Sequence, residues 1–279
     1  MLSEGVAVRE WGDPAQPAIL LWPGLGSTAA YFSAVAPLLP GHVLAADPPG
    51  FGRSPPPEAY SYEGVVDAAC AVIVDHSCHA LVGHSLGADL ALGVANEPPA
   101  GLEAVVLIDG GYMDATTRGA LGLPTGASRA ELTAWMAENG PRFPDWDAAV
   151  REIGAMWDAA ATPEVEVAVR DTFVEVDGEV RPVAPPDRLA DLLLAFLHQD
   201  IDDRARGTKV PILLIACAQP PERAAIKRPA WEAFAHASPL IEVRVAEEWG
   251  HNPPLQDAAG TARMVAEWLD PYLAKEAER

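Results

Sequence analysis

One short stretch limits what this chain can fold into: residues 81–92, Leu-Val-Gly-His-Ser-Leu-Gly-Ala-Asp-Leu-Ala-Leu. An apolar run ends in Gly-His-Ser-Leu-Gly and passes directly into a helical run. Gly-x-Ser-x-Gly at such a junction is typical of a strained strand-to-helix turn that holds a serine hydroxyl above the edge of a sheet. Gly83 and Gly87 stand where a side chain would push the strand and the helix apart. So short a pattern also arises by chance, but its flanking segments favour the turn, with Ser85 as a nucleophile.

Strands and helices alternate on both sides of this turn. The strands are continuously apolar, which indicates a sheet covered on both faces. We expect them at residues 5–11, 18–22, 43–46, 81–84, 104–108, 210–216 and 240–245, and helices at 29–39, 62–74, 222–237 and 257–273. The alternation predicts an α/β fold, a mostly parallel sheet with helices on both faces.

The alternation stops between residues 112 and 207. This segment contains helical patches at residues 129–139, 146–160, 163–169 and 186–198, and a hairpin around Asp177-Gly178. We interpret it as an inserted, mainly helical cap (112–207) over a core domain formed by residues 1–111 and 208–279.

The charge balance limits the partners. The chain carries 19 basic and 40 acidic residues, a formal net charge of −21, so it repels nucleic acid and anionic membranes and disfavours a highly anionic substrate. It has three cysteines without a Cys-x-x-Cys pair, no basic-then-apolar leader, and no apolar run of about 18 residues. We therefore expect a cytoplasmic protein with a small-molecule substrate, no metal or organic cofactor, and a monomeric or homodimeric state.

Four stretches in this order resemble the α/β-hydrolase superfamily, in its cap-containing serine-hydrolase (esterase or lactonase-like) branch. They are Pro-Gly-Leu-Gly-Ser at 23–27, Asp-Pro-Pro-Gly-Phe-Gly-Arg-Ser at 47–54, the serine turn at 83–87, and Trp-Gly-His-Asn-Pro-Pro-Leu at 249–255. The resemblance covers nearly the whole chain and implies a sheet of seven to eight strands. The 47–54 stretch is expected to be structural, with Asp47 and Arg53 able to pair.

A serine nucleophile needs a neighbouring base. The resemblance places it at His251, in the loop after the last strand, which Pro253 and Pro254 would stiffen. His198, on a cap helix, is a candidate pocket residue. The remaining histidines are expected to be surface or core residues: His42, His76, His79, His84 and His236.

The sequence offers more than one candidate for the acid of the triad. The family usually carries Gly-x-x-Asp after the strand at 210–216, but this chain reads Cys-Ala-Gln-Pro-Pro-Glu at 217–222. Relatives with a relocated acid keep it after the preceding sheet strand, where Asp109 stands. The separation from Ser85, 109 − 85 = 24 residues, suits one helix and one returning strand. We favour Asp109 and leave Glu222 and Asp114 as alternatives.

The oxyanion of a tetrahedral intermediate needs two N–H donors. One is expected from Leu86, directly after the nucleophile, and by resemblance the other comes from Leu25, with Gly24 and Gly26 letting the backbone approach the substrate. Among the apolar cap residues, Trp135 and Trp157 are candidates for the pocket lining.

These features predict a serine hydrolase that cleaves a carboxylic ester or lactone of an apolar small molecule through an acyl-enzyme. Two alternatives stay open. The same triad could serve a C–C bond hydrolase or a thioesterase, and the missing Gly-x-x-Asp leaves room for a non-hydrolytic receptor or cyclase on the same fold.

Overall fold

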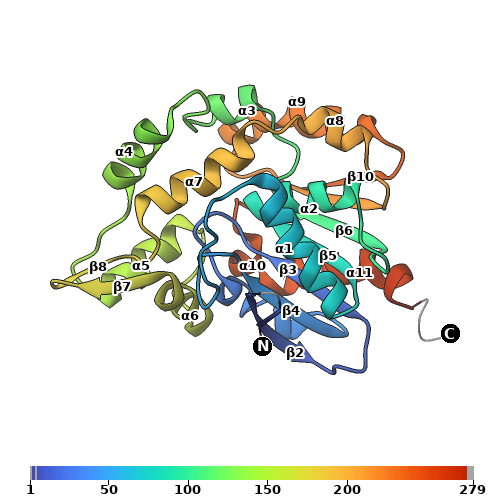
Figure 1. Ribbon diagram of the computed structural model, residues 1–279, viewed down its shortest axis with the longest axis horizontal. Coiled ribbons are helices and arrows are strands. Elements are labelled where there is room, and N and C mark those ends of the chain that lie inside the picture. Colours follow the sequence, from blue (N-terminus) through green and yellow to red (C-terminus); the bar gives the residue numbers. More distant parts are fainter. Residues whose placement is uncertain (1, 4, 275–279) are drawn as a thin grey trace.

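The computed structural model describes residues 2–3 and 5–274 of the chain. Its centre is an eight-stranded sheet in the order β1-β2-β4-β3-β5-β6-β9-β10 (Figure 1). Six neighbouring strands, from β4 to β10, run parallel to one another. Strand β2 pairs antiparallel with β4 on one side and with β1 on the other. The predicted α/β fold with a mostly parallel sheet is confirmed. The strands are β1 (Leu2–Ser3), β2 (Val6–Gly12), β3 (Ala18–Trp22), β4 (His42–Asp47), β5 (Cys78–His84), β6 (Ala104–Ile108), β9 (Ile212–Cys217) and β10 (Ile241–Ala246).

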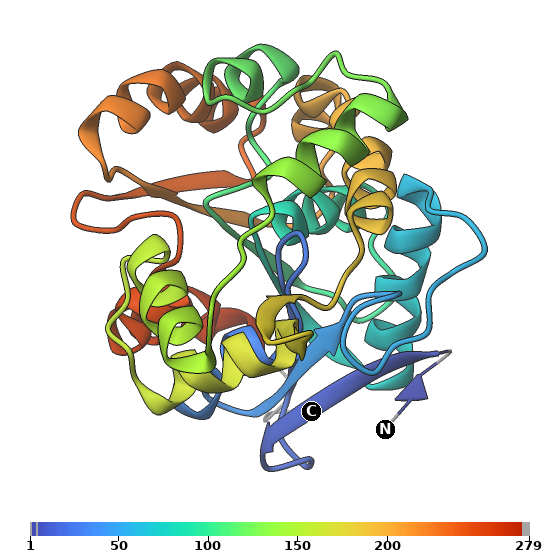
Figure 2. The same ribbon diagram turned by 90° about the vertical axis from the view of Figure 1, so that its left-hand side faces the viewer.

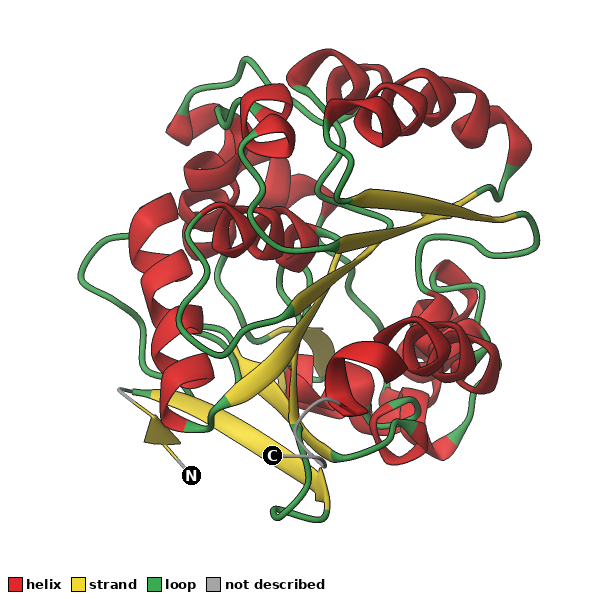
Figure 3. Cartoon of the chain, turned by 90° about the vertical axis from the view of Figure 1, so that its right-hand side faces the viewer, coloured by secondary structure: helices red, strands yellow, loops and turns green. Residues whose placement is uncertain are grey.

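Helices cover both faces of the twisted sheet (Figure 3). On one face lie α1 (Tyr62–Asp75), α2 (Leu86–Asn96) and α9 (Pro221–Ala237), whose buried side chains share one apolar cluster. On the other face lies α11 (Ala258–Leu273), whose buried side chains belong to a second cluster. The short helix α10 (Pro253–Gln256) precedes α11.

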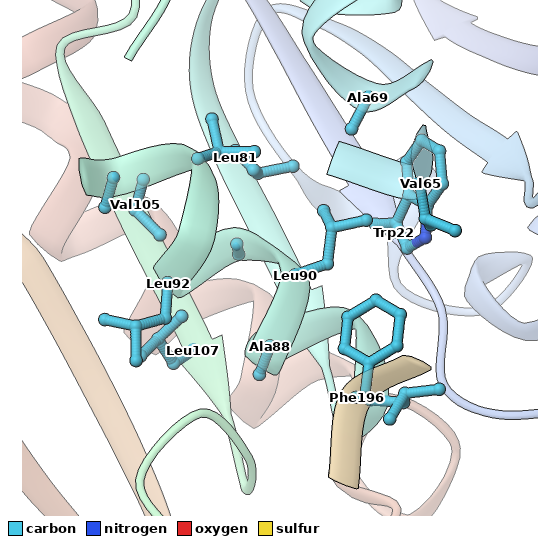
Figure 4. Packing of buried hydrophobic residues seen from close by; sticks show 14 of the residues in the cluster. Trp22, Val65, Ala69, Leu81, Ala88, Leu90, Leu92, Val105, Leu107 and Phe196 are labelled. Carbon is cyan, nitrogen blue, oxygen red and sulfur yellow. The ribbon is translucent and has the colours of Figure 1, made fainter. Parts of the chain in front are cut away.

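Both faces of each central strand are buried, which explains why these strands are continuously apolar. In β3, Leu20 and Trp22 belong to the first cluster, while Ile19 and Leu21 belong to the second. Alternate residues of a strand point to opposite faces, so a strand between two helical layers needs apolar side chains at every position. Figure 4 shows the first cluster, where Leu90 of α2 lies beside Trp22.

The single helix predicted over residues 29–39 is wrong. Two 3-10 turns occupy this segment, η1 (Ala29–Phe32) and η2 (Ala36–Leu38). Pro37 has no N–H with which to bond the carbonyl four residues earlier, and its ring crowds that carbonyl, which disfavours a continuous α-helix through this segment. The Ser33 hydroxyl and the Ser33 N–H both donate to the carbonyl of Ala30, at 2.7 and 3.1 Å, at the end of η1.

The segment between β6 and β9 carries the predicted helices and hairpin (Figure 2). Helix α4 packs along α7, and Asp177 and Gly178 both have positive φ, as a two-residue hairpin turn requires. Sequence analysis missed α3 and α8, which have only six residues each. The elements are α3 (Ala115–Ala120), α4 (Arg129–Asn139), α5 (Trp146–Met156), α6 (Pro163–Thr172), β7 (Phe173–Val176), β8 (Glu179–Pro182), α7 (Pro186–Leu197) and α8 (Ile201–Arg206).

Within residues 2–3 and 5–274, no helix combines the length and the apolar character that crossing a bilayer requires.

Candidate active site

Ser85 forms the whole connection between β5 and α2. Its backbone is left-handed, with φ 55° and ψ −120°, a strained conformation for a residue with a side chain. A Cβ on Gly83 would lie 2.1 Å from the carbonyl oxygen of Gly87, and a Cβ on Gly87 would lie 2.3 Å from the carbonyl oxygen of Trp22. Neither approach tolerates a side chain, so the two glycines permit the turn that exposes the serine.

Three residues predicted from the sequence meet at the carboxyl ends of the strands. The Ser85 Oγ lies 3.0 Å from Nε2 of His251, and Nδ1 of the same ring lies 2.8 Å from Oδ2 of Asp109. Asp109 follows β6 and His251 follows β10. The His251 side chain is 47% exposed and Asp109 only 1%. The arrangement can pass a proton from the serine to the imidazole, with a buried carboxylate behind the ring.

Asp109 accepts hydrogen bonds from other residues besides His251. Lys227 of α9 donates from Nζ to both carboxylate oxygens at 2.9 Å, and the Cys217 N–H and the Tyr112 hydroxyl donate to Oδ1. Burial by itself would raise the pKa of Asp109, but hydrogen bonds and charge interactions with His251 and Lys227 outweigh it and hold the pKa below its ordinary value. Asp109 is therefore ionised, as a group that orients and stabilises a histidinium must be.

Sequence reasoning missed Lys227, although the sequence contains a signal for it. Lys227 shares the buried face of α9 with Ala224, Trp231 and Phe234, at spacings of three and four residues. A lysine within an apolar helical stripe needs a buried anionic partner. Asp109 is that partner.

His84 also has a role that sequence analysis missed. Its Nε2 lies 2.8 Å from the carbonyl oxygen of His251, and its ring stacks on Tyr31 with centroids 4.7 Å apart. The Tyr31 hydroxyl in turn donates to Oδ1 of Asn252 at 3.1 Å. Burial, reinforced by the nearby His251 ring, lowers the pKa of His84 to about 3. A neutral His84 can donate from Nε2 and so fix the loop that carries His251.

The two residues expected to supply the oxyanion hole lie beside Ser85. Leu86 is the first residue of α2, so its N–H has no acceptor within the helix. Within the described residues, the N–H of Leu25 makes no hydrogen bond. Gly24 lies so close to Ser85 that a Cβ would come within 2.9 Å of the serine Cβ. The loop therefore reaches the nucleophile only because residue 24 is glycine.

Two cavities open onto Ser85 and His251. The apolar cavity, about 430 Å³, is lined by Gly24, Leu25, Gly26, Trp157 and Phe173 among others. The ionic cavity, about 550 Å³, is lined by Trp135 and by three acidic and three basic side chains: Asp89, Asp109, Asp158, Arg118, Arg223 and Lys227. Trp135 and Trp157 thus lie where the sequence placed them, in cavity walls.

Three candidates lie elsewhere. His198 is exposed and lines neither cavity, because it follows the end of α7 and is rotated about 140° around the helix axis from Leu193, which lines the ionic cavity. Glu222 is exposed in the first turn of α9, and no hydrogen bond or ion pair within the described residues joins it to His251. The Asp114 carboxylate accepts from the Thr117 N–H at 2.7 Å and caps α3. The rotation around α7 keeps His198 out of both cavities, and the capping contact holds Asp114 at the start of α3.

The stretch at 47–54 has the structural role expected of it. Asp47, which is fully buried, accepts from the Ala29 N–H at 2.9 Å and from Nε of Arg53 at 3.0 Å. It thereby ties the start of η1 to the loop after β4. The described residues include no group of three or more His, Cys, Asp or Glu side chains that could hold a metal ion.

Comparison with known proteins agrees with this architecture. Similar solved structures include an E-2-(acetamidomethylene)succinate hydrolase (21% identity, TM-score 0.74, covering 96% of this chain and 97% of that one). A second is a thioesterase domain from the curacin biosynthetic pathway (21% identity, TM-score 0.70, covering 93% of this chain and 94% of that one). A third is an esterase of M. tuberculosis (19% identity, TM-score 0.69, covering 95% of this chain and 89% of that one). At these identities the likeness establishes the fold.

A search of curated proteins finds no match. The model of the alpha/beta hydrolase family, however, matches residues 19–264, which is most of the chain. The protein therefore belongs to the alpha/beta hydrolase family.

Proposed function

We propose that this protein is a serine hydrolase that cleaves a carboxylic ester or lactone of an apolar small molecule through an acyl-enzyme. The observation that supports the proposal most is the continuous hydrogen-bond chain from Ser85 Oγ through His251 to a buried, ionised Asp109. A serine hydroxyl is a weak nucleophile unless a base takes its proton, and this geometry supplies the base and its orienting carboxylate.

The reaction then follows from these positions. His251 Nε2 takes the proton as Ser85 Oγ attacks the carbonyl carbon, and the N–H groups of Leu25 and Leu86 hold the oxyanion. The imidazolium, stabilised by Asp109, returns the proton to the departing alkoxide as the ester bond breaks. Water activated by His251 next attacks the acyl-enzyme, which releases the acid and restores the serine.

The apolar cavity supports the choice of an apolar substrate. Its side chains beyond the catalytic residues are mainly hydrocarbon and aromatic, contributed by Ile153, Trp157, Phe173 and Leu189. All four come from the segment at 112–207, which we propose acts as a cap that covers the substrate. Directed polar groups on an apolar wall are the usual composition of a small-molecule site.

Ser85→Ala tests the proposal directly. We expect turnover of a short p-nitrophenyl ester to fall by about 10⁴-fold or more, because the nucleophile is lost. Ser238→Ala is the matched control, since Ser238 lies between α9 and β10, at the opposite edge of the sheet. A fluorophosphonate should label the wild-type protein and leave Ser85→Ala unlabelled.

Unchanged turnover in Ser85→Ala would overturn the proposal. The contact between the Asp109 carboxylate and His251 supports a hydrolase over a non-hydrolytic receptor, since the site has an acid despite the missing Gly-x-x-Asp. Thioesters and β-diketones assayed beside oxygen esters distinguish the thioesterase and the C–C hydrolase, which would use the same three residues.

A further inference from the structure

The two cavities at the active site form an asymmetric pair. They share Leu25, Ser85, Met156, His251 and Asn252, so both reach the same serine. The apolar cavity contains no carboxylate, lysine or arginine, whereas the ionic cavity contains six charged side chains. A substrate that fills both cavities with its scissile bond at Ser85 therefore places one end against hydrocarbon and the other among charges.

The charges of the ionic cavity are unevenly placed. All three cations, Arg118, Arg223 and Lys227, come from α3 and α9, which pack against each other. Two of the three carboxylates are already neutralised: Asp89 accepts from Arg118 at 2.7 Å, and Asp109 accepts from Lys227 at 2.9 Å. The same two pairs neutralise Arg118 and Lys227, so Arg223 is the unpaired cation of the α3/α9 wall in a chain whose net charge is −21.

Arg118 offers a donor that the protein itself does not use. Its Nε donates to the Met113 carbonyl at 2.8 Å and its Nη2 donates to Asp89. Its Nη1 has no hydrogen-bond partner among the described residues, and it is not one of the fully enclosed unpartnered polar atoms. Arg118 as a whole is only 4% exposed, and it is one of the side chains that line the ionic cavity.

A purely structural role explains only part of this arginine. Asp89 also accepts from the Gly111 N–H at 3.1 Å, so the Arg118–Asp89 pair anchors the loop that follows Asp109. That anchoring uses Nε and Nη2. Nη1 is left over and is not fully enclosed, so a carboxylate of a ligand can replace solvent as its acceptor in a charge-assisted hydrogen bond.

Arg223 adds a second cation to the same wall. It stands four residues before Lys227, one turn along α9, and no ion pair within the described residues involves it. A carboxylate placed against Nη1 of Arg118 would gain a charge-assisted hydrogen bond and the field of Arg223. The remaining unpaired carboxylate, Asp158, comes from the residues just after α5 and not from this wall.

We propose that the ionic cavity binds a carboxylate at one end of the substrate, against Arg118 and Arg223, while the apolar cavity binds the other end. This assignment rests on the proposed esterase function and narrows it. The substrate class is an ester or lactone of a small molecule that is apolar on one side of the scissile carbonyl and bears a free carboxylate on the other.

Three esters of equal chain length test the assignment: p-nitrophenyl hexanoate, the mono-p-nitrophenyl ester of adipic acid, and its terminal amide. We expect kcat/KM for the adipate to exceed that for hexanoate by about tenfold, because a hydrogen bond to a charged group contributes about 1.5–3 kcal/mol. Arg118→Met should lower this ratio by about the same factor, and Arg223→Gln by less because Arg223 is exposed.

The ratio of kcat/KM for the adipate to that for hexanoate is measured within each variant. A general loss of active protein lowers both values alike and leaves their ratio unchanged. Arg170→Met is the control, because it removes an exposed cation of the cap that pairs with Glu166 and lines neither cavity. It should leave the ratio unchanged. A ratio near one in the wild type, or a ratio that survives Arg118→Met, would overturn the assignment, and an amide cleaved as fast as the adipate would overturn the choice of an anion.

Binding to Ser85→Ala separates this assignment from the proposed function. N-benzyladipamic acid should bind this variant at least about tenfold more tightly than N-benzylhexanamide by calorimetry, and Arg118→Met in the same background should abolish the difference. Arg118-dependent binding without ester turnover in the wild type would contradict the esterase alone. Ester turnover with equal binding of the two amides would contradict the carboxylate site alone.

Discussion

The two sides of the candidate active site hold their residues in different ways. On the core side, the main chain sets the positions: the N–H of Ser85 donates to Ile108 at 2.9 Å and that of Asp109 to Ile215 at 3.0 Å, continuing the ladders of the sheet. On the cap side, Trp135 and Trp157 come from the short helix α4 and the end of α5. Ten of the eleven residues of α2 are buried, but only Leu132 of α4 is. The core is therefore expected to determine the chemistry, and the cap the shape of the substrate.

The largest test of this difference compares two acids. Asp109→Asn should lower kcat by about 10⁴-fold, because an amide cannot stabilise the imidazolium and favours the wrong histidine tautomer. Glu222→Gln should leave kcat within about twofold, since Glu222 is exposed and a surface change of this kind costs little. Steady-state turnover of a p-nitrophenyl ester measures both. Equal, mild losses would remove Asp109 from its assigned role.

Two glycines extend the comparison to stability. Gly83→Ala should lower the free energy of unfolding by more than about 4 kcal/mol or prevent folding, because its Cβ would lie 2.1 Å from a backbone oxygen. Gly126→Ala in the cap segment meets nothing within 4 Å and should change it by no more than about 0.5 kcal/mol. Urea unfolding measures the two values. A Gly83→Ala protein as stable as Gly126→Ala would contradict the close approach at the turn.

The same contrast explains what the sequence could predict. Buried parallel strands are apolar at every position, and Ser85, Asp109 and His251 each follow a strand, so their meeting edge could be inferred from chain order. The apolar stripe of α9 indicates that Lys227 is buried, but no motif in the sequence links this lysine to Asp109, so its partner could not be predicted. His198 was misplaced because sequence periodicity does not say which side of a cap helix faces the substrate. Tertiary packing decides that side.

Lys227 should contribute strongly to stability despite lying outside the triad. Lys227→Met leaves the buried Asp109 carboxylate without its cation, so we expect a loss of about 3–5 kcal/mol in the free energy of unfolding at pH 7. Lys209→Met is the matched control, since Lys209 is exposed. Urea unfolding of both variants measures the difference. A Lys227→Met protein as stable as the control would mean that the Asp109 charge does not depend on this ion pair.

His84 predicts a dependence on pH. Its pKa is about 3 in the folded protein and 6.5 ordinarily, so between these values the unfolded chain binds the extra proton and the folded protein does not. The His84 contribution is therefore unfavourable as pH falls from 6.5 to 3, with a slope of at most about 1.4 kcal/mol per pH unit. His84→Gln should flatten the curve of unfolding free energy against pH in this window. An unchanged slope would indicate a charged His84 in the folded state.

The smallest effect is expected from an ion pair of the cap. Arg129 and Asp191 join α4 to α7 with hydrogen bonds of 2.5 and 2.7 Å, shorter than the two of 2.9 Å in the buried Lys227–Asp109 pair. The Arg129 side chain is 56% exposed, however, so water and salt screen the attraction and the side chains lose entropy when they pair. Arg129→Gln should leave the midpoint of thermal unfolding unresolved from wild type, and added salt should not separate the two. A clear loss of stability would show that the cap, like the core, depends on specific ion pairs. The two sides of the site would then differ in how their residues are buried, and not in how much single ion pairs contribute to stability.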